Sequence, residues 1–516
     1  MSGMSFKDSK RIYWASGIVS ICGVIFETLF GAAGSYVLGD GVKQYTLTIS
    51  LFLTGMGIGA YMSEKVIKQL ITTFICVEYL VAVFGGFSTF LMFGVTAYLP
   101  EGSDAFYLYT VIVIVGLLTG LELPLLIRKA NEIGIAIHKS AARVLFFDYA
   151  GGFIGGILFA FWMRPAFGMV KTAFIVGCVN LGVALWMLIA FRKHVRPFKG
   201  LLAIGIFIGI GLIAGVFFGD EGAFMFEQKL YTDPIVFQED TKYQKITMTK
   251  EQGDLRLYLD GNLQFSSADE DRYHEVLIHP AVAAAKNPEN ALILGGGDGL
   301  AARELLKYPF LKNITLVDLD PEMTHLARTN HLLTDQNKNS LNQSRVHIKN
   351  EDAFKYLQHH KKSYDVIIID LPDPNNESLN KVYTQEFYSL VHRHLKPDGA
   401  MMVQATSPYF ARKAYWTINK TISSAGFYTQ NLHVDIPSFG DWGYVLAAKH
   451  PFSVDDIKLK SVKMNYLTNQ LLHSLDEFGK DEDGNIYEKG KKVKLRPNTL
   501  IHPDLIEMYQ QAWLYY

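Results

Sequence analysis

The sequence predicts a two-part protein: an N-terminal polytopic bundle of α-helices in a membrane, then a small antiparallel β domain and an α/β domain with a doubly wound, mostly parallel sheet. Three observations support this fold class. Residues up to about 219 are almost continuously apolar, whereas most charged residues follow them. Short apolar strands then alternate with helices. A buried strand at 291–294 leads directly into the turn Gly295-Gly-Gly-Asp-Gly299.

The length of 516 residues is too great for one hydrophobic core and predicts several domains. We place a transmembrane domain at 1–219, a linker and small β domain at 220–285, a Rossmann-like domain at 286–450 and a charged helical extension at 451–516. The formal net charge of -1 gives no argument for nucleic acid. All three cysteines lie before 219, so the soluble half has no internal disulfide, which favours the cytosol.

The first half contains runs that reach the length of about 20 apolar residues needed to cross a bilayer as a helix. About seven such runs lie at roughly 13–38, 45–62, 72–98, 106–127, 144–163, 172–191 and 200–218. The first run is too long for a signal peptide and lacks a small-residue cleavage site. These runs predict a multi-pass protein of the cell membrane, with lipid as a partner.

Basic residues flank the apolar runs asymmetrically and bear on orientation. They precede the first run and follow the second, fourth and sixth, which places all of these ends in the cytoplasm by the positive-inside rule. Seven crossings would then put the soluble half outside the cell, whereas one re-entrant or interfacial segment would restore it to the cytoplasm. We expect the cytoplasmic placement, because segment boundaries are the least certain part of such a count.

Acidic residues also occur inside the apolar runs, where a charge costs a few kcal/mol or more. Two interpretations stay open for them. They form a pathway or sensor for a cation, or they are protonated or hydrogen-bonded within the bundle. The residues are Glu27, Glu78, Glu122 and Asp148.

After the apolar half, the periodicity changes to that of strands. Segments at 233–240, 244–249 and 255–259, separated by turns, predict a small antiparallel sheet. The larger domain follows, with strands expected near 291–294, 314–319, 345–349, 364–370, 399–405, 428–436 and 443–448. Ligands of such sheets bind outside the carboxyl ends of the parallel strands.

Carboxylates follow four successive strands of this predicted sheet. The glycine turn carries Asp298, and its glycines Gly295, Gly296, Gly297 and Gly299 let backbone amides approach a ligand closely. The next three strand ends carry Asp318, Asp352 and Asp370, the last followed by Asp373. A single acid at a strand end is ordinary helix capping. Acids after four strands indicate a site for a nucleoside with cationic groups.

These motifs, combined with others nearby, resemble the spermidine synthase (polyamine aminopropyltransferase) family over about residues 230 to 450. The first half resembles the membrane-embedded extension of a multi-pass subgroup of that family, and the fold implied for the second half is class I methyltransferase-like. The motifs that carry the resemblance are Tyr243-Gln244, Leu259-Asp260-Gly-Asn-Leu-Gln264, Asp269-Glu270, Tyr273-His274-Glu275, Gly295-Gly-Gly-Asp-Gly299, Arg303-Glu304 and Asp370-x-x-Asp373-Pro.

The resemblance implies transfer of an aminopropyl group from decarboxylated S-adenosylmethionine to an amine such as putrescine, with release of methylthioadenosine. The nucleoside is a co-substrate, and no cofactor or metal is implied. Asp318 would bind the ribose, Asp352 the adenine amine and Asp298 the aminopropyl ammonium, and Asp370 would be the base. The remaining implied substrate-binding residues are Asp373, Tyr243 and Gln244, which orient amines, and His274, Gln264 and Tyr383.

Elementary chemistry supports a base in such a site. An alkylamine attacks carbon only as its neutral form, yet its pKa resembles that of lysine, about 10.4, so it arrives protonated. A sulfonium is already a good leaving group, so positioning the two reactants supplies much of the remaining catalysis. Carboxylates should also disfavour a donor that keeps its own carboxylate.

Departures from the family pattern leave the acceptor open. The family continues from Asp373-Pro374 with a Gly-Pro turn, whereas this chain continues with 375–383. Trp442 and Tyr444 fit either the wall of the pocket or the core of the last strand. A methyltransferase that uses S-adenosylmethionine, or a polyamine transporter or sensor with a non-catalytic soluble domain, stays an alternative. The oligomeric state also stays open, a homo-oligomer included.

Overall fold

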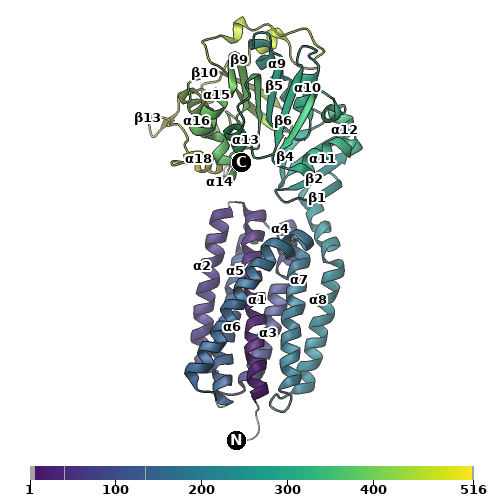
Figure 1. The fold of residues 1–516 in the computed structure, drawn as a ribbon, viewed down its shortest axis with the longest axis vertical. Coiled ribbons are helices and arrows are strands. Elements are labelled where there is room, and N and C mark those ends of the chain that lie inside the picture. Colours follow the sequence, from purple (N-terminus) through teal and green to yellow (C-terminus); the bar gives the residue numbers. More distant parts are fainter. Residues whose placement is uncertain (1–5, 40, 101, 134, 514–516) are drawn as a thin grey trace. The chain divides into compact units, whose positions relative to one another are not determined.

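The computed structural model describes residues 6–39, 41–100, 102–133 and 135–513. The chain divides into two compact units, Met1–Thr232 and Asp233–Tyr516. Figure 1 traces the elements of both units.

The first unit is built from long apolar α-helices, as the composition predicts (Figure 1). Among the residues that the structure describes, five helical stretches are long and apolar enough to cross a membrane, or six when α3 and α4, bent by 44° at their junction, count as one. This count is lower than the predicted seven because Ile137–Ala190 counts as a single stretch of 54 residues. The helices are α1 Phe6–Leu38, α2 Gly41–Met62, α3 Leu70–Gly86, α4 Ser88–Tyr98, α5 Ser103–Glu132, α6 Ile137–Leu158, α7 Arg164–Ala190 and α8 Phe198–Glu227.

Glycines allow close packing between α2 and α5. A side chain at Gly55 would lie 2.6 Å from the carbonyl oxygen of Val113, and one at Gly59 would collide with the carbonyl of Leu117. Small residues at such contacts are typical of helices that pack in lipid. Gly57, by contrast, has no atom within 4 Å of that position.

Two of the acidic residues predicted inside the apolar runs are buried together in this bundle. Glu78 on α3 has no exposed surface and Glu122 on α5 is 6% exposed. Their carboxyl groups interact electrostatically, and Asp148 on α6 interacts with Glu122. The helix α8 continues through Glu227, past the predicted domain boundary at 219.

The second unit begins with a four-stranded antiparallel sheet in the order β1-β2-β3-β4. Its last strand was not predicted, because Asp260-Gly261 turns the chain back so tightly that β4 follows after two residues. Both turn residues have a positive φ, which a glycine adopts without strain. The strands are β1 Ile235–Asp240, β2 Lys245–Glu251, β3 Asp254–Leu259 and β4 Asn262–Ser266.

The larger sheet has seven strands in the order β10-β11-β9-β8-β5-β6-β7. The five strands from β5 to β9 run parallel, and β11 is antiparallel to both β9 and β10. The sheet is therefore mixed, with the parallel part predicted. The strands are β5 Asn290–Gly295, β6 Asn313–Asp318, β7 Val346–Asn350, β8 Tyr364–Asp370, β9 Leu395–Gln404, β10 Tyr428–Ile436 and β11 Gly440–Ala448.

Helices cover both faces of this sheet because alternate strand residues point to opposite sides. Ile293 and Ile368 join one core with α9, α10 and α11, whereas Leu292 and Ile369 join a second core with α13, α15 and α16. The helices are α9 Glu270–Ala284, α10 Leu300–Leu306, α11 Pro321–Thr329, α12 His331–Asn337, α13 Ala353–His359, α14 Glu377–Asn380, α15 Gln385–His394 and α16 Arg412–Ser424.

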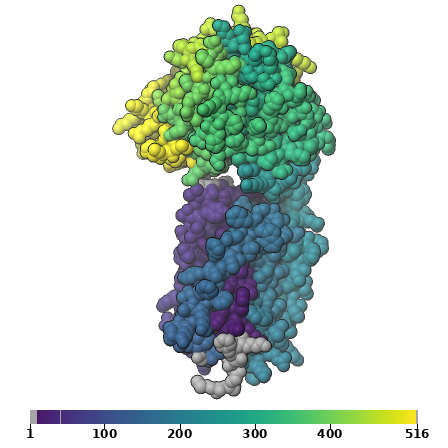
Figure 2. All heavy atoms as spheres, viewed as in Figure 1, coloured from purple at the N-terminus to yellow at the C-terminus, as the bar shows by residue number. Residues whose placement is uncertain are grey.

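The C-terminal segment departs from the predicted helical extension. Most of 451–503 is irregular, apart from the short 3-10 helix Val454–Asp456, the four-residue helix α17 Asn469–Leu472 and a short hairpin of β12 Tyr487–Glu488 and β13 Lys491–Lys492. A helix of useful length, α18 Asp504–Trp513, comes at the end. The charged composition suggested helix, but backbone N–H groups of 465–467 bond to the side chain of Glu275 on α9 instead. Figure 2 shows the yellow C-terminal residues spread over the surface of the second unit.

Candidate active site

The glycine turn and Asp370 are brought together by the pairing of β5 with β8. Gly295 lies directly opposite Asp370 in the parallel register. The amide of Gly296 donates a hydrogen bond of 3.1 Å to the carbonyl oxygen of Asp370. A side chain at Gly295, whose φ is +87°, would collide with that carbonyl. Only glycine therefore fits where the two strand ends meet.

Asp370 is held by a tyrosine that no prediction had assigned to the site. The hydroxyl of Tyr273, on α9, donates a hydrogen bond of 2.7 Å to Oδ1 of Asp370. Burial raises the pKa of Asp370 to about 6, with the negative charge of Asp298 adding to the rise and the positive charge of His274 opposing it. The group is thus mostly ionised at neutral pH and able to accept a proton.

His274 carries a buried positive charge close to Asp298 and Asp370. Its Nδ1 lies 2.9 Å from Oε2 of Glu270, one helical turn earlier. Burial opposes the charge, but the hydrogen bond and Coulomb attraction to Glu270 raise the pKa of His274 to about 9. Arg303 grips the same carboxylate from α10 with two bonds of 2.7 and 2.9 Å. The predicted pocket histidine is therefore an imidazolium fixed by an ion-pair network.

Asp298 occupies the middle of the glycine turn. Its Oδ1 accepts the backbone N–H of Leu300 at 2.9 Å, which is the capping role that any single acid at a strand end would have. Burial raises its pKa, and the positive charge of His274 counters that rise. The second carboxylate oxygen makes no hydrogen bond within the described part of the chain.

Asp318 ends β6 beside the glycine turn. Its Oδ1 accepts the N–H of Asp320 at 2.9 Å. Burial raises the pKa of Asp318 to about 7, and the charges of Asp320 and Asp298 add to this effect. A side chain at Gly297 would lie 2.6 Å from its Oδ2, so the turn and the carboxylate share one narrow space.

Asp352 follows β7 and caps α13, accepting the N–H of Lys355 at 3.1 Å. It also forms a short ion pair with Lys381, from the segment 375–383 in which the chain departs from the family pattern. Burial alone raises the pKa of Asp352, but the hydrogen bonds from Lys381 and Lys355 lower it. The ammonium group of Lys381 thus occupies the position that was predicted for the adenine amine.

Asp373 and Tyr383 are joined through Gln404 at the end of β9. The Nε2 of Gln404 donates to Oδ1 of Asp373 at 3.1 Å and to the hydroxyl of Tyr383 at 2.8 Å. That hydroxyl donates in turn to the carbonyls of Leu371 and Pro372, each at 3.1 Å. Tyr383 is fully buried, so its observed part is to fix the turn after β8.

Tyr243 and Gln244, in the turn between β1 and β2, and Gln264, on β4, form no hydrogen bond with Asp370 within the described part of the chain. Gln244 donates to Oδ2 of Asp320 at 3.0 Å, on the Asp318 side of the site. Tyr243 is 44% exposed and stacks with the ammonium of Lys242. Gln264 donates to the carbonyls of Asn262 and Leu263 beside it in β4.

The two late aromatic residues belong mainly to the core. Tyr444 is fully buried and packs edge-on against Tyr273 with ring centroids 5.6 Å apart. Trp442 packs on Phe439, which in turn lies against Tyr273. Both therefore support the tyrosine that holds Asp370.

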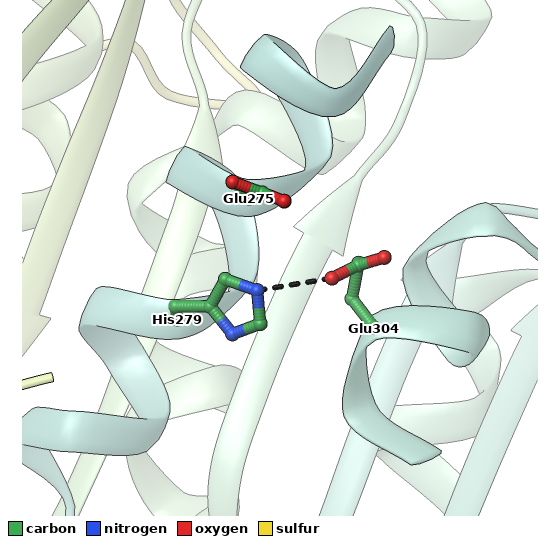
Figure 3. Close-up of side chains that lie close together, drawn as sticks. All are labelled: Glu275, His279 and Glu304. Atoms are coloured by element: carbon green, nitrogen blue, oxygen red, sulfur yellow. Dashed lines mark hydrogen bonds and ion pairs between the residues drawn. The ribbon is translucent and has the colours of Figure 1, made fainter. Parts of the chain in front are cut away.

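A second cluster, of two acids and one histidine, adjoins this network through Arg303 and Glu304. Its side chains already have hydrogen-bond partners (Figure 3). Glu275, His279 and Glu304 come within 4.8 Å of one another. His279 bonds Glu304 at 2.9 Å through Nε2 and the hydroxyl of Tyr308 at 2.6 Å through Nδ1. Glu275 accepts three backbone N–H groups from 465–467. These bonds use the atoms that a metal would need, so the cluster is structural.

Sequence reasoning could have found Tyr273, because it stands one residue before His274 in a quoted motif. Lys381 and Gln404 carried no such signal, since each reaches the site from a separate element.

This chain is similar to one protein family and to several known proteins. Residues 270–457 match the family model of the spermine/spermidine synthase domain. A polyamine aminopropyltransferase of Oceanobacillus iheyensis is 60% identical over 513 residues, covering 99% of both chains. One of Leptospira interrogans is 38% identical over 97% of this chain and 98% of its own. A crystal structure of spermidine synthase with the transition state analogue AdoDATO gives a TM-score of 0.44 at 25% identity, covering 48% of this chain and 85% of that one.

Proposed function

This chain belongs to the polyamine aminopropyltransferase family, and we propose that its second unit transfers an aminopropyl group from decarboxylated S-adenosylmethionine to a diamine such as putrescine. The observation that carries the proposal is the placement of Asp370. Its carboxylate ends β8 beside the glycine turn and is held by the hydroxyl of Tyr273 at 2.7 Å. That is where a base for an attacking amine is needed.

The transfer is a single displacement at carbon. The acceptor ammonium loses a proton to Asp370, and the lone pair of the resulting neutral amine forms a C–N bond with the aminopropyl carbon attached to sulfur. The C–S bond breaks, and its electron pair neutralises the sulfonium to give methylthioadenosine. With a pKa of about 6, Asp370 is ionised at neutral pH and can take the proton.

The donor is held along the ends of β5, β6 and β7. The ribose hydroxyls bond Asp318, and the backbone of the turn at 295–299 lies against the nucleoside. Asp298 takes the aminopropyl ammonium. The adenine amine bonds Asp352, which requires that Lys381 leave that carboxylate.

The acceptor lies on the other side of Asp370, toward Asp373. Asp373 and Gln404 meet there at 3.1 Å. A diamine presents one amine to Asp370 and its second ammonium to Asp373, and putrescine has this form. Tyr243, Gln244 and Gln264, on the small sheet, complete the site when substrate is bound.

The test is product analysis with the purified full-length chain in detergent. Incubation with decarboxylated donor and a panel of diamines should yield methylthioadenosine and an aminopropylated amine by mass spectrometry. Asp370→Asn should abolish turnover while methylthioadenosine still binds. Asp398→Asn, an exposed carboxylate on β9, serves as the matched control and should retain activity. Unchanged turnover in Asp370→Asn would exclude Asp370 as the base.

The same experiment tests the alternative that this protein is a methyltransferase of the same fold. Ordinary S-adenosylmethionine brings a carboxylate to a site that already contains Asp298 and Asp370, so like-charge repulsion disfavours it. Methyl transfer from that donor, with no methylthioadenosine formed, would replace the aminopropyl proposal.

We further propose that the first unit anchors the chain in the cell membrane, with lipid around its apolar helices. The stretch Ile137–Ala190 has 54 residues, about 80 Å at a rise of 1.5 Å each, against a hydrocarbon core of about 30 Å. Gly168 interrupts it with non-helical dihedral angles. It therefore supplies two crossings, α6 and α7. Retention in the membrane after alkaline carbonate extraction is expected, and release would contradict the proposal.

The side of the membrane on which the second unit lies follows from its substrates. We place it in the cytoplasm, where a nucleoside sulfonium is expected. Protease added to right-side-out vesicles should then spare the C-terminus, and digestion from outside would place it on the opposite side.

A further inference from the structure

The C-terminal helix α18 lies outside the residues that match the family domain, which end at 457, yet it packs on the catalytic core. Leu505 is fully buried, and Met508, Tyr509 and Ala512 pack against the same core as β8 and α16. The hydroxyl of Thr417 on α16 contacts the sulfur of Met508 at 3.4 Å. The helix is therefore a fixed part of the second unit.

Two consecutive side chains of α18 reach the turn that follows β8. The hydroxyl of Tyr509 interacts with the carboxylate of Asp373. The amide of Gln510 donates a hydrogen bond of 3.1 Å to the carbonyl oxygen of Asn375. In this segment the chain lacks the Gly-Pro turn of the family pattern. Contacts with α18 fix the backbone here, as a rigid turn would do by itself.

Aromatic rings surround the same contact. Trp513 lies 6.0 Å from Tyr509 and 5.4 Å from Phe410, between ring centroids. Aromatic faces pack against methylene groups and attract ammonium groups. A carboxylate with aromatic neighbours therefore suits the far end of a diamine, which has methylene groups and an ammonium group.

We propose that Tyr509 is a positioning residue that sets the acceptor specificity of this enzyme, by orienting Asp373 and, with Gln510, by closing the acceptor site at the far amine. The inference rests on the proposed function, because it assigns Asp373 to the second ammonium of the acceptor. It adds that α18 fixes the distance between Asp370 and that ammonium.

The test is steady-state kinetics of full-length Tyr509→Phe, which keeps the ring and removes the hydroxyl. The acceptor KM should rise about three- to tenfold, the range of one hydrogen bond, while the donor KM stays constant. The ratio of kcat/KM between diamines of three, four and five methylenes should move toward one. Gln510→Ala should change the same two quantities in the same direction.

Tyr487→Phe is the matched control, since Tyr487 belongs to the same C-terminal segment but is 62% exposed on β12. It should behave as the unsubstituted chain does. Equal changes in donor and acceptor KM, or an unchanged diamine preference in Tyr509→Phe at wild-type melting temperature, would overturn this inference alone. Absence of methylthioadenosine from the unsubstituted chain with every amine would instead overturn the proposed function.

Discussion

The pH dependence of the reaction should follow the ionisation of Asp370. Burial raises the pKa of Asp370 to about 6, and a base must be ionised to accept a proton. At that pKa about ten-elevenths of the group is ionised at pH 7 and about one-eleventh at pH 5. Turnover limited by this base therefore falls about tenfold between pH 7 and pH 5, and it changes little between pH 7 and pH 8.

Replacing His274 isolates this effect from other titrations. The imidazolium stabilises the carboxylate of Asp370, and its removal in His274→Gln leaves that carboxylate buried with Asp298 unopposed. The pKa of Asp370 must then rise, and the acid limb moves to higher pH by on the order of one unit, as for loss of a nearby opposite charge. The alkaline limb of the pH profile is not expected to move in the same direction.

The assay is kcat/KM for the sulfonium donor at saturating acceptor, followed by release of methylthioadenosine from pH 5 to pH 8. The donor carries no group that titrates in this range, so the profile reports the enzyme. His360→Gln is the control, since His360 follows α13 and stacks on Tyr356. An acid limb at the same pH in His274→Gln and the unsubstituted chain would refute the electrostatic reasoning.

Four other perturbations follow from single contacts. Lys381→Ala frees Asp352, so the donor KM should fall severalfold; a higher KM would mean that the lysine aids donor binding. Glu275→Ala leaves three backbone N–H groups of the C-terminal segment without an acceptor and should lower the free energy of unfolding by about 3 kcal/mol in urea titrations, against less than about 0.5 kcal/mol for exposed Glu289→Ala. Gly297→Ala should raise the donor KM at least about tenfold, because its methyl group would lie 2.6 Å from a carboxylate oxygen; unchanged donor binding would show that the turn adapts. Dialysis against a chelator should leave turnover unchanged, and loss restored by a divalent ion would reveal a metal requirement.

The strand ends of the site could be predicted because they depend on local pattern. A parallel sheet places the carboxyl ends of its strands at one edge, so Asp298, Asp318 and Asp370 were expected at the same edge once the strands were assigned. Their pairing is visible in the register of Gly295 with Asp370. The antiparallel end of the sheet was not predicted, because a strand's direction depends on where its chain returns.

Contacts between distant elements could not be predicted from pattern. Tyr273 and Asp370 lie 97 residues apart in the chain, and nothing in either segment indicates their hydrogen bond. Tyr243 matches a family motif and is 44% exposed, and its part in substrate binding stays a prediction.

The buried imidazolium of His274 explains how two acids can share a site built for cations. Burial raises the pKa of both Asp298 and Asp370, and the charge of Asp298 raises the pKa of Asp370 further, so without a counter-charge one of them would hold a proton. Glu270 keeps His274 charged, and Arg303 keeps Glu270 charged in turn. The network therefore keeps Asp370 ionised until an amine arrives, while leaving the site with an excess of negative charge that still attracts ammonium groups.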